Sequence, residues 1–136
     1  MRERRIISFD VGEKRIGVAR AIVPPRITQP LKTLLNDASL PVELQQLIQD
    51  EQPDVLVVGL PRNQSGQETA QTEYVRDWVQ RYLFQLGIPI IWQDESLTSV
   101  LAEQQLESYA RPYKKEDIDA MAAALILSDY LEGMQL

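Results

Sequence analysis

Residues 4–20, RRIISFDVGEKRIGVAR, decide the fold because they describe one strand, a turn and a second strand. The apolar run IISF (6–9) is typical of a strand that enters a protein core, and we predict a strand over residues 4–10. The turn VGEK leads into RIGVARAI (15–22), so the two segments are predicted to form a hairpin. The first strand runs directly into Asp10, and a carboxylate at the end of a buried strand is costly unless something pairs with it.

Alternating strands and helices are predicted after the hairpin. Residues 23–30 contain three prolines, which remove backbone donors, so this segment is predicted to be irregular and to precede a short strand near residues 32–34. A hairpin followed by β-α-β-α units predicts a single α/β domain over residues 1–136, with a mixed sheet and helices packed on it. Apolar periodicity and turn residues predict helices over residues 40–52, up to Gly87, over 96–110 and over 117–132, and buried strands over 54–59 and 88–93.

The composition narrows the chemistry that the chain can perform. No apolar run approaches the roughly 20 residues that span a bilayer, and no signal-type segment follows Met1, so we expect a cytoplasmic protein without a membrane partner. The absence of cysteine suits a reducing compartment. The absence of histidine excludes zinc sites built from Cys and His, and it excludes triads whose base is imidazole. A hydrolase of this composition would activate water with carboxylates and a hard metal ion.

Basic residues are unevenly distributed, although the formal net charge is −6. Residues 1–26 hold seven basic residues against three acidic ones, and Lys114 and Lys115 form a second basic spot. An acidic chain is a poor general coat for nucleic acid, because phosphate binding needs Lys and Arg. A local basic rim of Lys14, Arg15 and Lys114 is nevertheless predicted to hold phosphates.

Acidic residues occur at three places where a sheet of this kind gathers ligands, beyond the carboxyl ends of its strands. Asp10 follows the first strand, Asp94 and Glu95 follow the strand at 88–93, and Asp119 lies in the first turn of the last predicted helix. Because neighbouring residues alternate along a strand, only one of Asp94 and Glu95 can face Asp10. Such carboxylates can hold Mg²⁺, which prefers oxygen ligands, and two such ions about 4 Å apart can activate water at a phosphodiester.

Each acidic position also has an ordinary structural explanation. A single Asp after a strand is commonly a turn or cap residue, and an Asp in the first turn of a helix is favoured by the helix dipole alone. The pair DE after a strand is commonly the solvated start of a loop. Spacing by itself therefore leaves open both a shared metal site and three unrelated acids.

Four segments together resemble the signature blocks of the YqgF family. They are FDVGEKRIGVA (9–19), VVGLPRNQSG (57–66), WQDESLT (92–98) and IDAMAAALIL (118–127), in family order across nearly the whole chain. YqgF proteins are small bacterial proteins with an RNase H-like fold, proposed as Holliday-junction resolvases and as nucleases that mature the 5′ end of pre-16S rRNA. One block would be weak evidence, whereas four in order are highly specific.

The resemblance implies both a site and a strand order. Asp10, Glu95 and Asp119 match the family's metal-binding, catalytic carboxylates, for which Mg²⁺ is expected and Mn²⁺ is the alternative. The choice of Glu95 over Asp94 depends on this match. The sheet is expected to be five-stranded and mixed, in the order 3-2-1-4-5 with strand 2 antiparallel. The substrate-binding candidates are Lys14, Arg15, Arg62, Asn63, Thr98 and Lys114.

The chain departs from the family pattern in two places. Ser96 stands where the family usually has an arginine, and this removes a phosphate contact beside the site. After GVA, Arg20, Ala21 and two prolines replace the small residue and aspartate of many members. Neither change touches the three carboxylates, so metal chemistry is still expected, whereas the contacts that hold the substrate are less defined.

Several functions remain open on this basis. A nuclease for the 5′ end of pre-16S rRNA is favoured, because an acidic chain with modest basic patches suits a substrate presented within a ribosomal precursor particle. A Holliday-junction resolvase makes two symmetric cuts and so normally works as a homodimer, whereas an rRNA-trimming enzyme can act as a monomer. A protein that binds structured nucleic acid without cutting it is a third possibility. A kinase-type ATPase also begins with a strand, an Asp and a Gly-rich hairpin, but it needs two such domains.

Overall fold

A five-stranded mixed sheet forms the centre of the protein in the computed structural model, which describes residues 3–95, 104 and 114–134. The strand order is β3-β2-β1-β4-β5. Strand β2 is antiparallel to both of its neighbours, whereas β1, β4 and β5 are parallel. The order and directions expected from the family resemblance are therefore confirmed. The strands are β1 (Arg4–Val11), β2 (Arg15–Val23), β3 (Ile27–Leu35), β4 (Val55–Pro61) and β5 (Ile90–Glu95).

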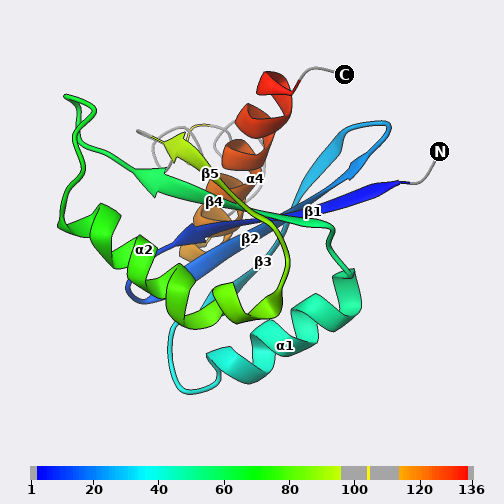
Figure 1. Ribbon diagram of the computed structural model, residues 1–136, viewed down its shortest axis with the longest axis horizontal. Coiled ribbons are helices and arrows are strands. Elements are labelled where there is room, and N and C mark those ends of the chain that lie inside the picture. Colours follow the sequence, from blue (N-terminus) through cyan, green and yellow to red (C-terminus); the bar gives the residue numbers. More distant parts are fainter. Residues whose placement is uncertain (1–2, 96–103, 105–113, 135–136) are drawn as a thin grey trace.

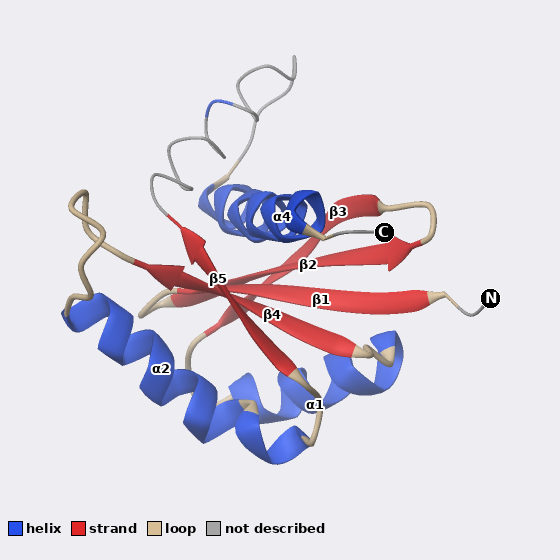
Figure 2. Cartoon of the chain, turned by 45° about the horizontal axis from the view of Figure 1, so that its top comes forward, coloured by secondary structure: helices blue, strands red, loops and turns tan. Residues whose placement is uncertain are grey.

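Helices cover both faces of the sheet (Figures 1 and 2). Helix α4 lies on one face, and α1 and α2 lie together on the other. No helix within the described ranges is both long enough and apolar enough to cross a membrane. The helical elements are α1 (Leu40–Glu51), α2 (Ala70–Tyr82), the short 3-10 turn η1 (Phe84–Leu86) and α4 (Lys115–Gly133).

Strand β1 supplies side chains to both cores, because successive residues point to opposite faces. Ile7 and Phe9 pack in the core under α1 and α2, whereas Ile6 packs in the core under α4. Ser8 also faces α4 and donates a hydrogen bond from its hydroxyl to the Ala123 carbonyl, at 2.7 Å. Alternation therefore places Asp10, which is half-buried, on the α4 face at the carboxyl end of β1.

Strand β3 is longer than expected, because residues 27–30 belong to it and are not irregular. Pro30 is tolerated because β3 lies at the edge of the sheet, where one side of the strand needs no partner. The register shifts between Val18 and Ala19, so Leu31 is an extra residue opposite β2. The prediction of an irregular segment over residues 23–30 was thus wrong for residues 27–30, which belong to β3. The bulge at Leu31 lets β3 pair with β2 on both sides of this extra residue.

The helix boundaries differ from the expected ones in two places. The helix predicted to run up to Gly87 ends at Tyr82 and is followed by η1, and Gly87 then adopts a left-handed φ of 72°. Helix α4 begins at Lys115, and Asp117 caps it by accepting a hydrogen bond from the Lys114 backbone N–H at 2.8 Å. The helix predicted over residues 96–110 falls almost wholly outside the described residues.

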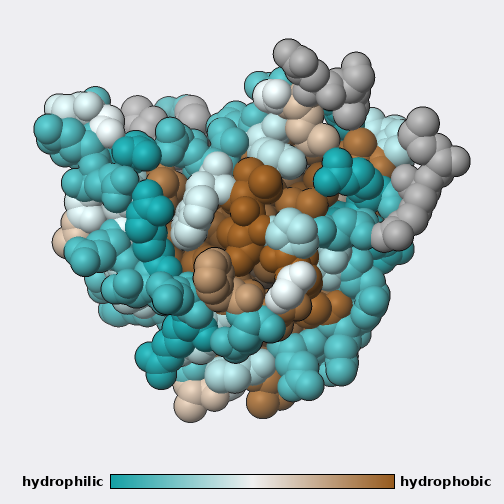
Figure 3. All heavy atoms as spheres, viewed as in Figure 1, coloured by the Kyte–Doolittle hydropathy of each residue, from teal (hydrophilic) through white to brown (hydrophobic). Residues whose placement is uncertain are grey.

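Strand β5 forms the second edge of the sheet, and its carboxyl end carries Asp94 and Glu95. Its side chains Ile91 and Trp92 are 36% and 37% exposed. Figure 3 shows that apolar residues gather in the middle of the face seen in Figure 1, with hydrophilic residues around them. The candidate carboxylate of Glu95 belongs to this edge strand, whereas Asp10 belongs to β1, the central strand of the sheet.

Candidate active site

Gly17 is the point at which α4 touches the sheet most closely. It pairs with Asp10 across the β1–β2 hairpin, and Cα atoms of such antiparallel pairs lie about 5 Å apart. A Cβ atom on Gly17 would lie only 1.9 Å from the backbone carbonyl oxygen of Asp119. A side chain at residue 17 would therefore push the helix away. The missing side chain brings the backbones of Asp10 and Asp119 together on one face of the sheet.

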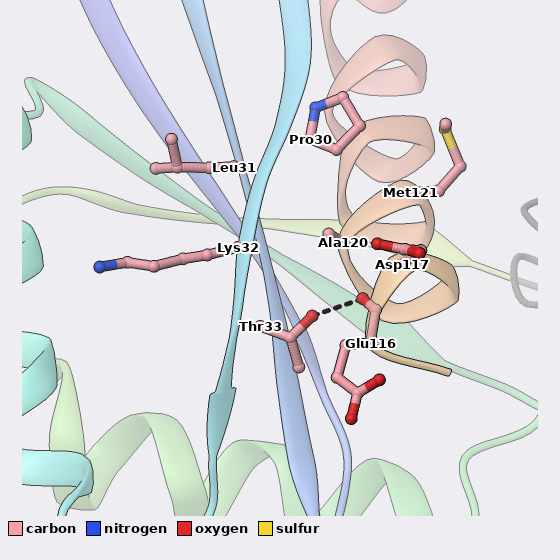
Figure 4. Close-up of a pocket in the computed structure, with 8 residues that line it drawn as sticks. All are labelled: Pro30, Leu31, Lys32, Thr33, Glu116, Asp117, Ala120 and Met121. Carbon is pink, nitrogen blue, oxygen red and sulfur yellow. Dashed lines mark hydrogen bonds between the residues drawn. The ribbon is translucent and has the colours of Figure 1, made fainter. Parts of the chain in front are cut away.

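Hydrogen bonds from two other strands fix α4 along its own axis. Ser8 of β1 bonds the Ala123 carbonyl, and the Thr33 hydroxyl of β3 donates to the Glu116 carbonyl at 2.6 Å. Figure 4 shows Thr33 pointing toward the helix, whereas Lys32 points away from it. Asp119 lies between these two anchored carbonyls. The contacts of α4 with β1, β2 and β3 thus determine the position of the Asp119 backbone.

Asp119 was expected in the first turn of the last helix, and this expectation was wrong. Because α4 begins at Lys115, the acidic residues of its first turn are Glu116 and Asp117. Asp117 caps the helix through the Lys114 N–H, which is what an acid near a helix N-terminus commonly does. Asp119 lies beyond this turn, so the helix dipole alone does not account for it.

Arg15 forms an ion pair with Asp119, because its Nε atom lies 2.5 Å from Oδ2. The two side chains are 30% and 22% exposed. The hydrogen bond to Asp119, together with its negative charge, raises the pKa of Arg15. Arg15 was predicted to bind substrate, and in the structure its guanidinium binds one of the three candidate carboxylates.

The third carboxylate is only partly defined by the structure. The Glu95 backbone pairs with Pro61 at the end of β4 and β5, and its side chain lies outside the described part of the chain. Asp94 pairs with Leu60, and its carboxylate lies 3.0 Å from Nε of Arg62. Leu60 is two residues from Val58 and so points to the same face, toward the core under α1 and α2. Asp94 is therefore on the face opposite Asp10, and the choice of Glu95 stays a prediction.

Two substrate-binding candidates, Arg62 and Asn63, lie in the β4–α2 loop and form contacts within this loop and with β5. Arg62 bonds Asp94 and donates to the Gly66 carbonyl at 3.3 Å. Asn63 accepts hydrogen bonds from the backbone N–H groups of Ser65 and Gln67, at 3.0 and 2.9 Å. These contacts order the loop, and none of them reaches Asp10 or Asp119.

The other substrate-binding candidates are more loosely placed. Lys14, in the β1–β2 turn, and Lys114, before α4, are both exposed. Neither side chain forms an ion pair within residues 3–95, 104 and 114–134. Thr98 and Ser96 lie outside the described residues. The structure thus brings Arg15, Asp10 and Asp119 to one region and leaves the two lysines open to solvent.

Asn36 was missed by the sequence analysis, although it anchors the turn that follows Asp10. Its side-chain amide donates to the Gly12 carbonyl at 3.1 Å and to the Tyr74 hydroxyl at 2.8 Å. Its backbone N–H donates to the Lys14 carbonyl at 2.9 Å. No local sequence pattern predicts these contacts, because they join three segments that are distant in the sequence.

The oxygen donors at this site suit a hard divalent cation. Asp10 and Asp119 offer only carboxylate oxygens, and the chain contains no His or Cys that would favour a softer metal. Among the described residues no cluster of three metal-ligating side chains is formed. The described part of the site therefore supplies two carboxylates.

Comparisons with known sequences identify the family. The RuvX family model, described as Holliday junction resolvase, matches residues 4–133. A protein of Chloroflexus aggregans is 39% identical over 98% of this chain and 96% of its own length. A protein of Lactococcus lactis subsp. lactis is 35% identical over 97% of this chain and 96% of its own. Both relatives are named "Putative pre-16S rRNA nuclease".

Comparisons with solved structures identify the fold. The chain superposes on Thermus thermophilus RuvC in complex with Holliday junction substrate, with a TM-score of 0.57, 14% identity and 95% coverage of both chains. It also superposes on the fowlpox virus Holliday junction resolvase, with a TM-score of 0.52 and 13% identity, covering 96% of this chain and 99% of that one. Identities this low establish the RNase H-like fold alone. The family model and the relatives above 30% identity establish more, and the chain belongs to the RuvX family, which is the YqgF family of the sequence resemblance.

Proposed function

We propose that this protein is a metal-dependent nuclease that processes the 5′ end of pre-16S rRNA. Membership of the RuvX family supports nuclease chemistry, and the names of the curated relatives support this substrate. The observation that carries the proposal is the approach of Asp119 to Asp10 across the bare backbone of Gly17. The activity is assigned to one domain spanning residues 1–136 and acting in the cytoplasm.

The proposed metal ligands are Asp10, Glu95 and Asp119. They would hold Mg²⁺, with Mn²⁺ as the alternative, because both ions accept carboxylate oxygen ligands. Bound there, the ion would activate a water molecule and stabilise the leaving oxygen of the phosphodiester. No imidazole is available for these tasks, since the chain has no histidine.

The basic residues around the site have a separate role in this proposal. Lys14 lies in the turn just beyond Asp10, and Lys114 precedes the helix that carries Asp119. Both are exposed, and both are assigned to the phosphates that flank the bond to be cut. They position the nucleic acid backbone, and they carry no information about its sequence.

The choice of substrate depends on the charge of the molecule. With a net charge of −6 and few basic side chains at the site, the protein has little general attraction for nucleic acid. An RNA presented by a ribosomal precursor particle would compensate for this weakness. A four-way DNA junction is the second candidate, because the family is described as Holliday junction resolvase. In that case a homodimer is expected, since two symmetric cuts need two sites.

The test compares two labelled substrates, a 5′-extended 16S rRNA fragment and a four-way DNA junction, each with Mg²⁺, Mn²⁺ or EDTA. Asp10→Asn removes one proposed ligand. Asp77→Asn is the matched control, because Asp77 lies on the exposed side of α2. Metal-dependent cutting of the RNA that Asp10→Asn abolishes and Asp77→Asn keeps would support the proposal.

Other outcomes of this experiment would redirect the assignment. Cutting of the junction alone would select the resolvase. Tight binding without cutting, by a folded protein in the presence of metal, would overturn the nuclease in favour of a protein that only binds structured nucleic acid.

A further inference from the structure

Arg15 and Asp119 form an ion pair with each other, although the proposed function gives each of them a different partner. Asp119 is a proposed metal ligand, and Arg15 was expected to bind a substrate phosphate. In the structure the two bind each other, with Nε of Arg15 2.5 Å from Oδ2 of Asp119. Arg15 is the first residue of β2, and its carbonyl accepts a hydrogen bond from the Gly12 N–H. Its backbone is therefore held by the hairpin while its side chain reaches α4.

A divalent cation and this guanidinium would compete for the same carboxylate. Each is attracted by the negative charge of Asp119, and the two positive charges repel each other at short range. The ion pair is also partly exposed, and pairs of this kind contribute little to stability. The pair can therefore open without unfolding the helix or the strand. A metal bound by Asp119 would weaken the contact to Arg15, and Arg15 would weaken metal binding to the same extent.

We propose that Arg15 exchanges partners, leaving Asp119 when a divalent metal binds there and then binding a phosphate of the nucleic acid. This inference rests on the proposed function, because it assumes Asp119 as a metal ligand. A guanidinium suits the second partner, since its planar donors match phosphate oxygens in pairs. The exchange would make metal and nucleic acid bind cooperatively, because the metal releases the cation that the phosphate needs.

The neighbouring basic residues do not share this arrangement. Lys14 has no ion pair among the described residues, so metal binding would not release it. Arg20, on the same strand, points to the other face of the sheet, where its Nη1 atom lies 3.0 Å from Glu51 of α1. Arg15 is thus the basic residue of β2 whose partner is a proposed metal ligand, and Arg20 is a matched control.

The first measurement is the affinity for Mn²⁺ alone, determined by titration calorimetry for five proteins: wild type, Arg15→Gln, Arg15→Lys, Arg20→Gln and Asp119→Asn. Arg15→Gln is expected to bind Mn²⁺ about two- to fivefold more tightly, which is within the range for loss of one partly exposed competing charge. Arg15→Lys keeps the charge and is expected to stay near wild type, as is Arg20→Gln. Equal affinities of wild type and Arg15→Gln would overturn the exchange, and so would an equal gain in Arg15→Lys.

The second measurement is binding of the 5′-extended 16S rRNA fragment, with Ca²⁺ in place of Mg²⁺ to suppress cutting, and with EDTA. Wild type is expected to bind the RNA about fivefold or more tightly with Ca²⁺ than with EDTA, in line with common coupling strengths. Arg15→Gln is expected to lose most of that gain, whereas Arg20→Gln keeps it. A gain that persists in Arg15→Gln would overturn the proposal.

Asp119→Asn separates failure of this inference from failure of the proposed function. If Asp119→Asn binds Mn²⁺ as well as wild type, the proposed metal site itself is wrong. If Asp119→Asn loses Mn²⁺ while Arg15→Gln is unchanged, the metal site stands and only the exchange by Arg15 is wrong.

Discussion

Gly17 is the residue on which the close approach of the Asp119 backbone to the β1–β2 hairpin depends. A Cβ atom there would meet the Asp119 carbonyl oxygen at 1.9 Å, and the atom that would have to move is backbone of α4. A clash with backbone cannot be relieved by a change of rotamer, so the helix itself would shift. The small residue is thus required by a neighbour that is about a hundred positions further along the chain.

Gly17→Ala is therefore expected to lower the free energy of unfolding by about 2–3 kcal/mol, and to weaken Mn²⁺ binding as well. Urea unfolding and calorimetry measure the two effects. Gly133→Ala is the matched control, because nothing lies within 4 Å of a Cβ atom there and its φ is not left-handed. An alanine at residue 17 that leaves both quantities unchanged would contradict the close approach of α4 to β2.

Helix α4 is positioned as a whole by hydrogen bonds from its flanking strands. Ser8 is fully buried and bonds the Ala123 carbonyl, and Thr33 bonds the Glu116 carbonyl near the start of the helix. These two contacts lie on either side of Asp119 along the helix. They restrict sliding of α4 along its axis, which the apolar contacts of its alanine-rich face would not restrict as strictly.

We expect Ser8→Ala combined with Thr33→Val to lower the free energy of unfolding by about 2 kcal/mol, since each lost bond contributes about 1 kcal/mol. The double variant should also bind Mn²⁺ more weakly, because Asp119 would no longer be held in register with Asp10. Thr28→Val on β3 is the control, as Thr28 forms no side-chain hydrogen bond in the described part of the protein. Lower stability with unchanged metal affinity would mean that the two bonds stabilise the helix without positioning Asp119.

The β1–β2 hairpin is held in place by Asn36, which bonds Gly12 and Tyr74 through its side chain. Asn36→Ala removes both side-chain bonds, and it is expected to cost about 1–2 kcal/mol of stability and to weaken RNA binding through Lys14. Tyr74→Phe removes only the second bond and should have the smaller effect on both. Urea unfolding and RNA titration test this order, and a larger effect of Tyr74→Phe would contradict it.

The parts of the molecule that could be predicted from sequence are those encoded in neighbouring residues. The hairpin and the buried strand at β4 follow from unbroken apolar runs, and Asp10 could be recognised because it ends such a run. The strand order was expected from the resemblance, not from periodicity. The length of β3 was missed because an edge position and a bulge, which local sequence does not reveal, make Pro30 acceptable in a strand.

The contacts that complete the site could not be predicted, because they join residues far apart in the sequence. Arg15 and Asp119 are 104 positions apart, and Ser8 and Ala123 are 115 apart. The residue types indicated carboxylates suited to a hard cation, which stays a prediction. They did not reveal that Arg15 binds a carboxylate, that Arg62 binds Asp94 of β5, or that Asn63 forms contacts within its own loop.

The charge of the whole molecule predicts how its binding to nucleic acid responds to salt. Each phosphate contact adds about 0.7 to 0.9 to the slope of log K against log salt concentration. Three candidates, Lys14, Arg15 and Lys114, are proposed to contact phosphates, and the net charge of −6 argues against a broad basic surface. We therefore expect a slope of about −2 to −3 for the RNA fragment in the presence of Ca²⁺.

Single substitutions measure how much each basic residue contributes to this salt dependence. Lys14→Gln should reduce its magnitude by about 0.7 to 0.9, the share of one phosphate contact. Lys32→Gln should leave the slope unchanged, because Lys32 lies on β3 and points away from α4 (Figure 4). With EDTA the wild-type slope should also fall by about one contact, since Arg15 would then stay with Asp119. A slope of about −8 would place most phosphate contacts on a different surface, and a slope that Lys14→Gln leaves unchanged would remove Lys14 from the site.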